Sequence, residues 1–471
     1  MSLFRPIAPL VVALAVAAPC LAAPELAPLF KDHAVLQCDK PVPVWGLAAP
    51  GEHVSVAFGG QSVGTTAGSD GRWITFLTPL PSNPSGSDLT VTGKGTTMIH
   101  DVLVGEVWLC AGQSNMEYPV NDPGNGAHVE NAAAEVAAAS YPLIGHFKVS
   151  RRASASPVDE AGGEWKVCSP GSVGQFTAVG YFFARDIFDR LGVPVGIINC
   201  TWSGTPIEAW MSPAALALFP GFSNGHGSVD QAAGKGDPWV PGALFNGMVH
   251  PLLPCAIRGV LWYQGESNVG RAGAYAQQFP ALITSWRSHF GQGDIPFLWV
   301  QLANFRAPPS GRGEVLPYLR EAQARALALP ATGQAVAIDI GDPASINPRN
   351  KQEVGRRLAL IAKAKVYAIP VDYSGPAFTG AEAEGASMRV HFRFTGEGIT
   401  ASDKPLQSFE VAGADKLFHP AKAVIQGSTL LVQSPLVKQP VAVRYAWRNA
   451  PEANLYNGAG LPAAPFRSDD W

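Results

Sequence analysis

The middle of the chain alternates short apolar segments with amphipathic helical segments, and this alternation restricts the fold more than any other feature. Apolar runs without polar alternation are typical of central strands buried on both faces. Strands that alternate with helices form a parallel sheet covered by helices on both sides. We therefore predict the α/β class, as a three-layer α/β/α sandwich around a five-stranded parallel sheet. The strands are expected at 104–110, 195–200, 258–263, 296–301 and 334–340, and helices at 177–191, 274–290 and 350–363.

The two ends of the chain have a different pattern, with short alternating runs separated by glycine, proline and asparagine turns. This pattern is typical of antiparallel β-structure. We therefore predict a β-module at 24–98, the central α/β domain at 99–370 and a second β-module at 371–471.

The first 23 residues combine an early positive charge, an apolar run at 7–18 and small residues at the end. This is the pattern of a secretory signal peptide, with cleavage expected after Ala22 or Ala23. The run is shorter than the roughly 20 apolar residues of a membrane-spanning helix, so no membrane anchor is expected. Cys20 directly follows a proline, which disfavours lipoprotein processing. We predict a secreted or periplasmic protein.

The net charge and the cysteine content argue against several classes of binding partner and of structural site. The formal net charge is −3 and no block of like charge occurs, which argues against binding to nucleic acid or to an anionic membrane. Five cysteines follow the signal segment, an odd number without paired spacing, so neither a disulfide scaffold nor a zinc site is indicated. One disulfide remains compatible with an exported protein. We interpret Cys110 and Cys200 as core residues of two strands.

Polar residues follow three of the predicted strands at the point where each ends. Ser114 lies in a Gly-Gln-Ser-Asn turn after the first, Gly204 in a Trp-Ser-Gly-Thr turn after the second, and Gln264 and Glu266 after the third. Ligands of parallel sheets bind at the carboxyl ends of the strands. A serine in such a turn exposes its hydroxyl beside backbone N–H groups that can stabilise an oxyanion. The three segments together predict a site at this edge.

The sequence around these residues resembles the sialate O-acetylesterases, a family of carbohydrate acetylesterases within the SGNH hydrolase superfamily. The resemblance extends over essentially the whole mature chain. It rests on motifs in the family's order: LFKDHAVLQCDKPVPVWG, GEVWLCAGQSNMEYPV, TWSGTPIEAW, GVLWYQGESN, DIGDPASINPRNKQEVGRRLAL and NLYNGAGLPAAPFRSDDW.

This resemblance implies hydrolysis of acetyl esters on sugar hydroxyls through an acyl-enzyme, with neither a cofactor nor a metal. It implies Ser114 as the nucleophile and Glu266 as the acidic member of the catalytic group. The N–H groups of Ser114 and Gly204 and the side chain of Gln264 would form the oxyanion hole. The neighbours Gln113, Asn115 and Trp202 are further candidates for substrate binding, and Trp202, Trp210 and Tyr118 for stacking on a sugar ring.

One catalytic position departs from the family pattern. Asn347 stands where the family has its histidine, and Ser345 replaces a usual aspartate. A neutral amide does not accept the serine proton, and loss of a triad member costs several powers of ten in rate. Three interpretations remain: a weakened or silent protein that still binds acetylated glycans, recruitment of another base, or action of Glu266 on Ser114, directly or through water.

Other histidines are candidates for the missing base. His226 lies in the loop at 220–240, after the second strand and on the same side as Ser114. His250 precedes the third strand and is expected at the opposite edge, as a structural residue. His419 belongs to the C-terminal β-module and is a weaker candidate. The leading prediction is a carbohydrate O-acetylesterase for acetylated sialic acid or plant-type glycans, and the alternative is a catalytically silent glycan-binding protein.

Overall fold

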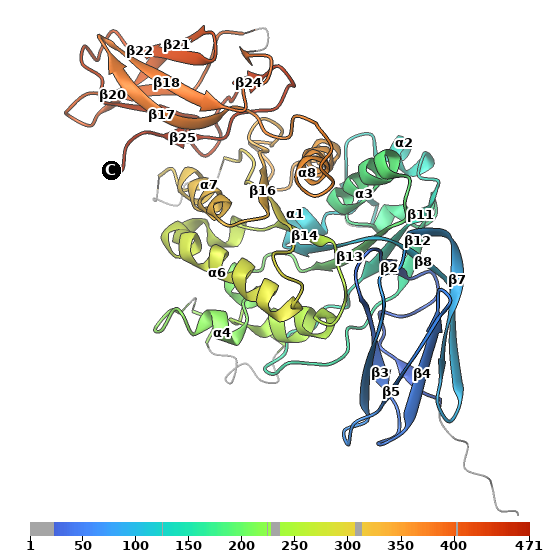
Figure 1. Ribbon diagram of the computed structural model, residues 1–471. Coiled ribbons are helices and arrows are strands. Elements are labelled where there is room, and N and C mark those ends of the chain that lie inside the picture. The colour runs from blue at the N-terminus through green and yellow to red at the C-terminus, as the bar shows by residue number, and fades with distance from the viewer. Residues whose placement is uncertain (1–22, 125, 224, 228–235, 307–312, 402–403) are drawn as a thin grey trace, which may run out of the picture.

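The computed structural model describes residues 23–124, 126–223, 225–227, 236–306, 313–401 and 404–471 (Figure 1). Apart from Ala23, the predicted signal peptide lies outside the described residues. Within those residues, no helix is both long and apolar enough to cross a membrane.

An eleven-stranded sheet runs through the centre of the molecule, with helices on both sides (Figure 1). Its main path has the order β12-β11-β13-β8-β14-β15-β16. The six strands from β11 to β16 along this path pair in parallel, and β12 is antiparallel at one edge. The bounds are Thr96–Gly112 (β8), Tyr141–Lys148 (β11), Trp165–Cys168 (β12), Val195–Thr201 (β13), Gly259–Tyr263 (β14), Phe297–Val300 (β15) and Thr332–Ala335 (β16).

The mixed α/β class is confirmed, but the parallel part has six strands instead of the predicted five. The additional strand is β11, whose apolar pattern is interrupted by Gly145 and the buried His146. The last strand ends at Ala335 and not near residue 340. Beyond it, the Arg357 guanidinium donates to the carbonyl of Val336 at 2.6 Å and pairs with Asp339. This part of the backbone is therefore held by a side chain and not by a neighbouring strand.

The three predicted helices are confirmed with small shifts in their bounds. They are α3 (Ala178–Leu191), α6 (Ala272–Phe290) and α8 (Lys351–Lys365). Thr177 and Asn350 cap α3 and α8 by accepting N–H groups of the first turn. α3 packs against α8 on one face of the sheet, and α6 packs against α7 (Leu316–Arg325) on the other (Figure 1). Shorter helices are α1 (Ser114–Glu117), α2 (Ala132–Ala137) and α4 (Pro213–Leu216).

The N-terminal strands are continuous with the central sheet, because the long strand β8 belongs to both. Its first half pairs with β7, and residues 103–105 pair in parallel with β2. A three-stranded sheet of order β1-β3-β6 packs beside these strands. The bounds are Glu25–Leu26 (β1), Val35–Gln37 (β2), Val42–Leu47 (β3), His53–Phe58 (β4), Gln61–Thr66 (β5), Arg72–Leu77 (β6) and Asn83–Thr92 (β7).

The C-terminal strands form a separate sheet with its own apolar core, seen in orange and red in Figure 1. Its seven strands have the order β17-β18-β22-β21-β20-β23-β25, and every pair along this path is antiparallel. The bounds are Ala377–Glu384 (β17), Ser387–Arg393 (β18), Phe409–Ala412 (β20), Phe418–Gln426 (β21), Thr429–Gln433 (β22), Ala442–Tyr445 (β23) and Phe466–Arg467 (β25). Two-residue strands elsewhere are Asn121–Asp122 (β9), Ala127–His128 (β10), Ile399–Thr400 (β19) and Tyr456–Asn457 (β24).

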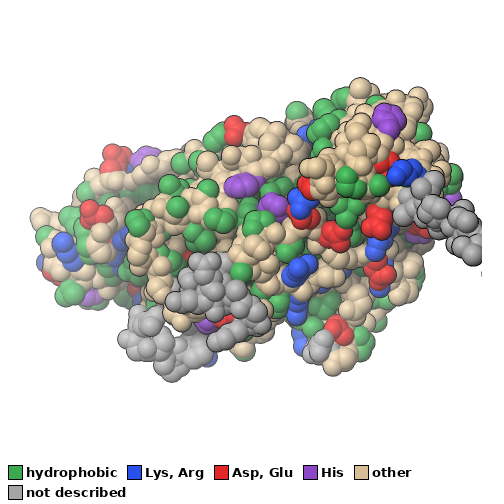
Figure 2. Space-filling model, turned by 90° about the horizontal axis from the view of Figure 1, so that it is seen from below, with side chains coloured by type: hydrophobic (Ala, Val, Ile, Leu, Met, Phe, Trp, Pro, Cys, Tyr) green, Lys and Arg blue, Asp and Glu red, His purple; other side chains and the backbone are tan. Residues whose placement is uncertain are grey.

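The described cysteines carry free thiols, so the structure shows no disulfide among them. Cys110 and Cys200 are fully buried, as predicted for core residues. On the face shown in Figure 2, basic and acidic side chains are interspersed and are not gathered by sign.

Candidate functional site

Three strand ends meet at one edge of the sheet, and their register aligns them. Gly112, the last residue of β8, pairs with Thr201 of β13 on one side and with Tyr263 of β14 on the other. Gly112 has a φ of +133°, and a Cβ atom there would lie 2.2 Å from the carbonyl oxygen of Tyr263. Only glycine fits this close approach. The chain can therefore turn sharply after β8 and begin α1 at Ser114.

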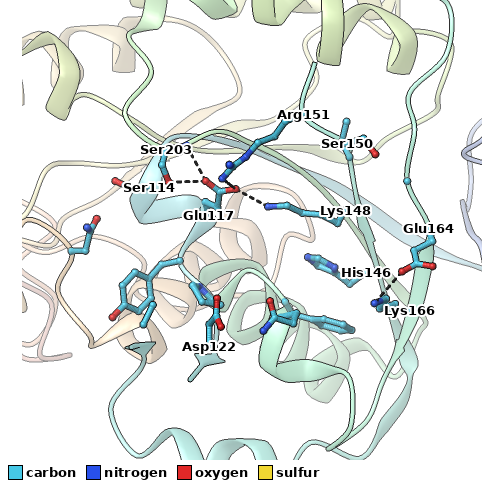
Figure 3. Close-up of a pocket in the computed structure, with 18 of the residues that line it drawn as sticks. Ser114, Glu117, Asp122, His146, Lys148, Ser150, Arg151, Glu164, Lys166 and Ser203 are labelled. Atoms are coloured by element: carbon cyan, nitrogen blue, oxygen red, sulfur yellow. Dashed lines mark hydrogen bonds and ion pairs between the residues drawn. The ribbon is translucent and has the colours of Figure 1, made fainter. Parts of the chain in front are cut away.

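Ser114 lines a polar cavity of about 1020 Å³ at this edge (Figure 3). Figure 3 shows Ser114, Ser203, Glu117 and Arg151 gathered at one side of the cavity, with Lys166 and Glu164 at the other. Asn347 lines the same cavity. The structure thus brings together the candidate nucleophile and the residue at the position of the family's histidine.

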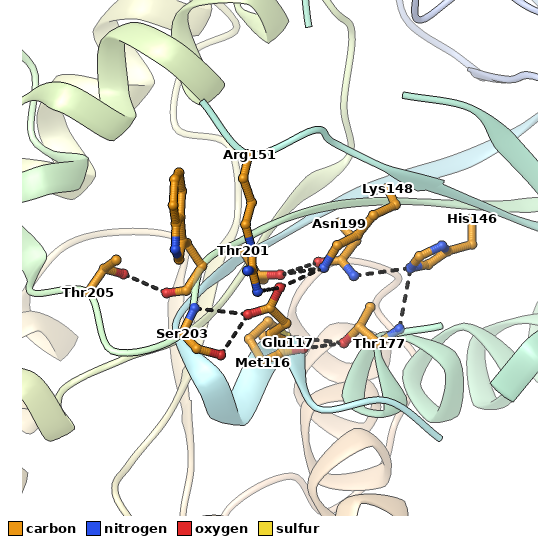
Figure 4. A network of polar contacts seen from close by, with 11 residues as sticks. Met116, Glu117, His146, Lys148, Arg151, Thr177, Asn199, Thr201, Ser203 and Thr205 are labelled. Carbon is orange, nitrogen blue, oxygen red and sulfur yellow. Dashed lines mark hydrogen bonds and ion pairs between the residues drawn. The ribbon is translucent and has the colours of Figure 1, made fainter. Parts of the chain in front are cut away.

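Glu117, one turn of α1 after Ser114, is the centre of a polar network in this cavity (Figure 4). Its carboxylate accepts the backbone N–H of Ser203 at 2.9 Å and the Ser203 hydroxyl at 2.7 Å. It also pairs with Lys148 at 2.9 Å and with Arg151 at 2.6 Å. Burial raises the pKa of this carboxyl, but the charge of Lys148 and the hydrogen bonds from Ser203 and Arg151 more than offset burial and leave the pKa lowered. Glu117 is therefore an anion that holds the Ser203–Gly204 turn.

The sequence did not reveal this network. Glu117 and Ser203 lie inside recognised motifs without an assigned role, and Lys148 ends the strand β11 that the apolar pattern missed. The contacts between Glu117 and its partners join residues 31 to 86 positions apart. Lys148 lies at the carboxyl end of β11, and it lines the same cavity as Ser114.

His146 also lines the cavity, but its geometry does not make it a base. Its Nε2 atom accepts the N–H of Thr177 at 3.3 Å and lies 3.3 Å from the Nδ2 of Asn199, and its ring stacks on Phe176. Burial, with smaller contributions from Lys148 and Lys166, lowers its pKa to about 3. The ring is neutral near pH 7, and the nitrogen that accepts protons is already occupied.

The side chain of Asn347 has no hydrogen-bond partner for its Oδ1 atom among the described residues, although that atom is buried. Its backbone is fixed by Ser345, whose hydroxyl accepts the Asn347 N–H and donates to the Asn347 carbonyl, both at 3.2 Å. An unpartnered carbonyl oxygen of a residue that lines the Ser114 cavity can accept a hydrogen bond, but an amide does not titrate near neutral pH.

Asn115 connects Glu266 to Lys351 beside this cavity. Its amide nitrogen donates to Glu266 Oε1 at 2.5 Å and to the carbonyl of Ile346 at 2.9 Å, and its oxygen accepts from Lys351 Nζ at 2.5 Å. The bond to Ile346 holds the segment that carries Asn347. Asn115 therefore joins α1, the end of β14 and the start of α8 around position 347.

Lys351 is fully buried and Glu266 is partly buried, with its Oε2 atom out of contact with solvent, and their charges partly compensate each other. Burial raises the pKa of Glu266, against the opposing effects of the Asn115 hydrogen bond and the Lys351 charge. Burial lowers the pKa of Lys351 to about 7, against the opposing charge of Glu266. Glu266 lines a second cavity, of about 180 Å³, together with Asn115 and Ile346. The structure does not bring Glu266 into the cavity that Ser114 lines, so a direct role as base has no support in this geometry.

The two glutamines of the predicted site are buried between the loops. Gln113 Oε1 accepts the N–H groups of Gly265 at 3.4 Å and Ser267 at 3.3 Å. The Gln264 amide donates to the Thr205 carbonyl at 3.2 Å and to Asn268 Oδ1 at 2.7 Å, so both glutamines hold loops together. The expected oxyanion role of Gln264 stays a prediction.

The remaining aromatic candidates differ in exposure. Trp202 is partly exposed beside the Glu117 network, and Arg151 covers its ring at 5.5 Å. Tyr118 lines the cavity, and its hydroxyl donates to the carbonyl of His128. Trp210 is fully buried and donates to Thr205, so its proposed stacking on a sugar was wrong.

The three candidate histidines lie in different parts of the molecule. His250 lines a different cavity, between the N-terminal strands and the segments at 152–160 and 250–254, and its Nδ1 atom lies 2.9 Å from the carbonyl of Val158. His419 lies in β21 of the C-terminal sheet. His226 lies 3.6 Å from Asp237 and stacks on Trp239, which donates to the carbonyl of Gly204. His226 is thus near the Ser203–Gly204 turn, although it does not line the Ser114 cavity.

In the described part of the chain, no group of three or more histidine, cysteine or acidic residues is arranged to hold a metal ion.

Comparison with known proteins identifies the family of the chain. A family model described as carbohydrate esterase, sialic acid-specific acetylesterase, matches residues 104–363. The human and rat sialate O-acetylesterases are each 30% identical to the chain, and the alignments cover 90% of it and 88% and 90% of those proteins. A carbohydrate acetylesterase from Xanthomonas citri has a similar structure, with a TM-score of 0.87, 43% identity and coverage of 95% of this chain and all of that one. The chain therefore belongs to the carbohydrate esterase family of sialic acid-specific acetylesterases.

Proposed function

We propose that this protein hydrolyses acetyl esters on sugar hydroxyls through an acyl-enzyme on Ser114. The observation that carries the proposal is the position of Ser114, at the start of α1 and on the wall of a large polar cavity, in a chain of this esterase family. The cavity is lined with hydroxyl and charged groups, which suit a polyhydroxylated substrate better than an acyl chain.

In the proposed reaction, Ser114 Oγ attacks the acetyl carbonyl and the N–H groups of Ser114 and Gly204 stabilise the oxyanion. The sugar leaves as an alcohol and takes up the proton that Ser114 loses. Water then hydrolyses the acetyl-serine, which releases acetate and restores the hydroxyl. Glu117 supports this geometry by fixing the turn before Gly204.

Asn347 sets the rate in this proposal. Its amide accepts a hydrogen bond but does not remove a proton, so Ser114 attacks without the imidazole base of the family pattern. We therefore expect slow turnover. The alternative is a glycan-binding protein without turnover, and the same substitution is the feature that favours it.

The finer parts of the proposal rest on sequence. Acetylated sialic acid is a candidate substrate because the relatives are sialate O-acetylesterases. Secretion or export to the periplasm rests on the pattern of the first 23 residues. The division into modules at 24–98, 99–370 and 371–471 rests on the change in sequence pattern along the chain.

Acetate release from 4-nitrophenyl acetate and from O-acetylated sugars tests the proposal. Ser114→Ala is the test variant, and Ser428→Ala, at an exposed turn between β21 and β22, is the matched control. We expect measurable turnover in the wild-type protein and in Ser428→Ala, and its loss in Ser114→Ala. Equal acetate release by Ser114→Ala and wild type would contradict the proposal, and binding of acetylated sugars without any release would establish the alternative.

A further inference from the structure

Trp239 is exposed beside the turn that carries Gly204, although its ring is held in place. About 40% of its surface is accessible, and its indole N–H donates to the carbonyl of Gly204 at 2.8 Å. Its own N–H donates to Asp237 Oδ1 at 2.9 Å. The ring of His226 stacks on it, with 5.7 Å between the centroids and 27° between the planes.

These contacts distinguish Trp239 from a tryptophan that is exposed by chance. Scattered apolar side chains at a surface are ordinary and need no explanation. An indole fixed by its N–H, its backbone and a stacked ring has little freedom left to lose when a ligand binds. Asp237 and His226 add polar groups at the same place, and both are partly exposed. An apolar ring surface flanked by hydrogen-bonding groups matches the two kinds of surface that a pyranose presents.

The hydrogen bond between the ring and Gly204 indicates which sugar of the substrate the ring would contact. In the proposed function, the N–H of Gly204 binds the acetyl oxygen at the edge of the cavity, where the preceding residue, Ser203, lines it. Trp239 binds the carbonyl of the same residue and does not line the cavity that contains Ser114. The ring therefore lies outside the place of the acetylated sugar, next to it. Trp202, on the other side of Gly204 in the sequence, already has Arg151 over its ring.

We propose that Trp239 is a stacking platform for a neighbouring sugar of the substrate, and that the substrate is therefore an acetylated oligosaccharide or polysaccharide rather than a free monosaccharide. This inference rests on the proposed function, because it needs the acetylated sugar to lie between Ser114 and Gly204. His226 and Asp237 bind hydroxyl groups of the same neighbouring sugar. The bond from Trp239 to Gly204 fixes the ring relative to the site of reaction.

Calorimetric titration of the Ser114→Ala protein tests the platform, because the acetyl groups then stay intact during binding. The probes are chemically O-acetylated cellohexaose and xylohexaose, with the O-acetylated methyl glycosides of glucose and xylose as single-sugar counterparts. The test variant is Trp239→Ala in the Ser114→Ala background. The matched control is Trp471→Ala, since Trp471 is 38% exposed at the C-terminus, against the C-terminal sheet.

We expect Trp239→Ala to weaken binding of an acetylated hexaose about tenfold, which corresponds to about 1.4 kcal/mol for one stacked ring, and to leave binding of the single sugars unchanged. Trp239→Phe keeps an aromatic ring without the N–H, so its affinity for the hexaose is expected to lie between those of the parent protein and Trp239→Ala. Trp471→Ala is expected to change neither. Unchanged hexaose binding in Trp239→Ala, or an equal loss for hexaose and single sugar, would overturn the platform. Acetate release by the wild-type protein, lost in Ser114→Ala, is a separate measurement that decides the proposed function in either case.

Discussion

Glu117 links the residue that attacks to the turn that is proposed to stabilise the oxyanion. It lies three residues after Ser114 and accepts both the N–H and the hydroxyl of Ser203, directly before Gly204. Lys148 and Arg151 keep it ionised. A carboxylate in this position orients the Gly204 peptide without contact with the reacting atoms, which makes it a positioning residue.

Glu117→Gln should therefore reduce kcat more than it changes KM. A glutamine accepts fewer of these hydrogen bonds and leaves Lys148 and Arg151 without their anion, so we expect kcat on 4-nitrophenyl acetate to fall about 10- to 100-fold. Glu164→Gln is the control, since Glu164 lines the same cavity and forms an exposed ion pair with Lys166 at 3.0 Å. Wild-type kcat in Glu117→Gln would rule out the positioning role.

At the scale of residues, the sequence identified Ser114 and Asn347, because both lie in long family motifs. The structure shows that both residues line one cavity. The sequence did not locate Glu117, Lys148 or Arg151, because their pairing depends on the distance between chain segments and not on local pattern. The role of Glu266 as the acidic member of the catalytic group stays a prediction, and its side chain lines a separate, smaller cavity. A motif indicates which residues lie at a strand end, but not into which space each side chain points.

At the scale of elements, Asn115 and Lys351 join three parts of the fold: α1, the end of β14 and the start of α8. Lys351 is fully buried and stands over the rings of Tyr118 and Tyr263 at 5.2 and 5.3 Å. The buried carboxyl of Glu266 on the other side of Asn115 is the group that compensates its charge.

Lys351→Met should therefore destabilise the protein strongly, because it leaves Glu266 buried without a cation. We expect a loss of about 3–5 kcal/mol in the free energy of unfolding, measured in urea. The double variant Glu266→Gln/Lys351→Met should recover part of that loss, since neither charge then remains buried. A double variant that is less stable than Lys351→Met would show that the charges do not compensate each other.

The elements of the fold were predicted where their patterns are continuous. β13 and α3 match the expected ranges within a residue, because one is apolar throughout and the other has a capped apolar face. β11 was missed because Gly145 and His146 interrupt its apolar pattern, although both are buried in the sheet. β16 was placed too far along the chain, since the apolar residues after Ala335 pack without a neighbouring strand.

At the scale of the whole molecule, Arg320 of α7 attaches the C-terminal sheet to the α/β domain. It is fully buried and donates to the carbonyls of Leu302 at 2.8 Å and Ala303 at 2.7 Å. From the C-terminal part it binds the carbonyls of Arg448 at 2.8 Å and Asn449 at 2.9 Å. The planar guanidinium is suited to such a set of acceptors, which a lysine would not satisfy.

Arg320→Met should weaken this attachment. Four carbonyls lose the guanidinium as a donor, although the Asn449 carbonyl keeps the N–H of Phe305 at 3.1 Å. Each buried group left unsatisfied costs about 1–3 kcal/mol, so we expect a clear drop in the melting temperature. Limited proteolysis should then release a C-terminal fragment that is protected in the wild-type protein. Arg325→Met is the control on the same helix, because Arg325 is exposed and forms a surface ion pair with Glu321. Equal melting temperatures for the two variants would contradict the account of Arg320.

The overall arrangement of an α/β centre with β-structure at both ends followed from sequence pattern. The sequence pattern did not show that β8 runs without a break from the N-terminal strands into the central sheet. A change in pattern marks a change in packing, and one strand can continue across it. The attachment through Arg320 was likewise invisible, since it joins a side chain to carbonyls more than 120 residues away.

The rate of Asn347→His is the most direct test of the central claim, that Ser114 is the nucleophile and that position 347 is the place of its missing base. We predict that kcat on 4-nitrophenyl acetate rises by about 100-fold or more, that the rise follows deprotonation of a group with a pKa near 6.5, and that adding Ser114→Ala abolishes it. A folded Asn347→His protein with unchanged kcat, or a rise that survives Ser114→Ala, would contradict the account.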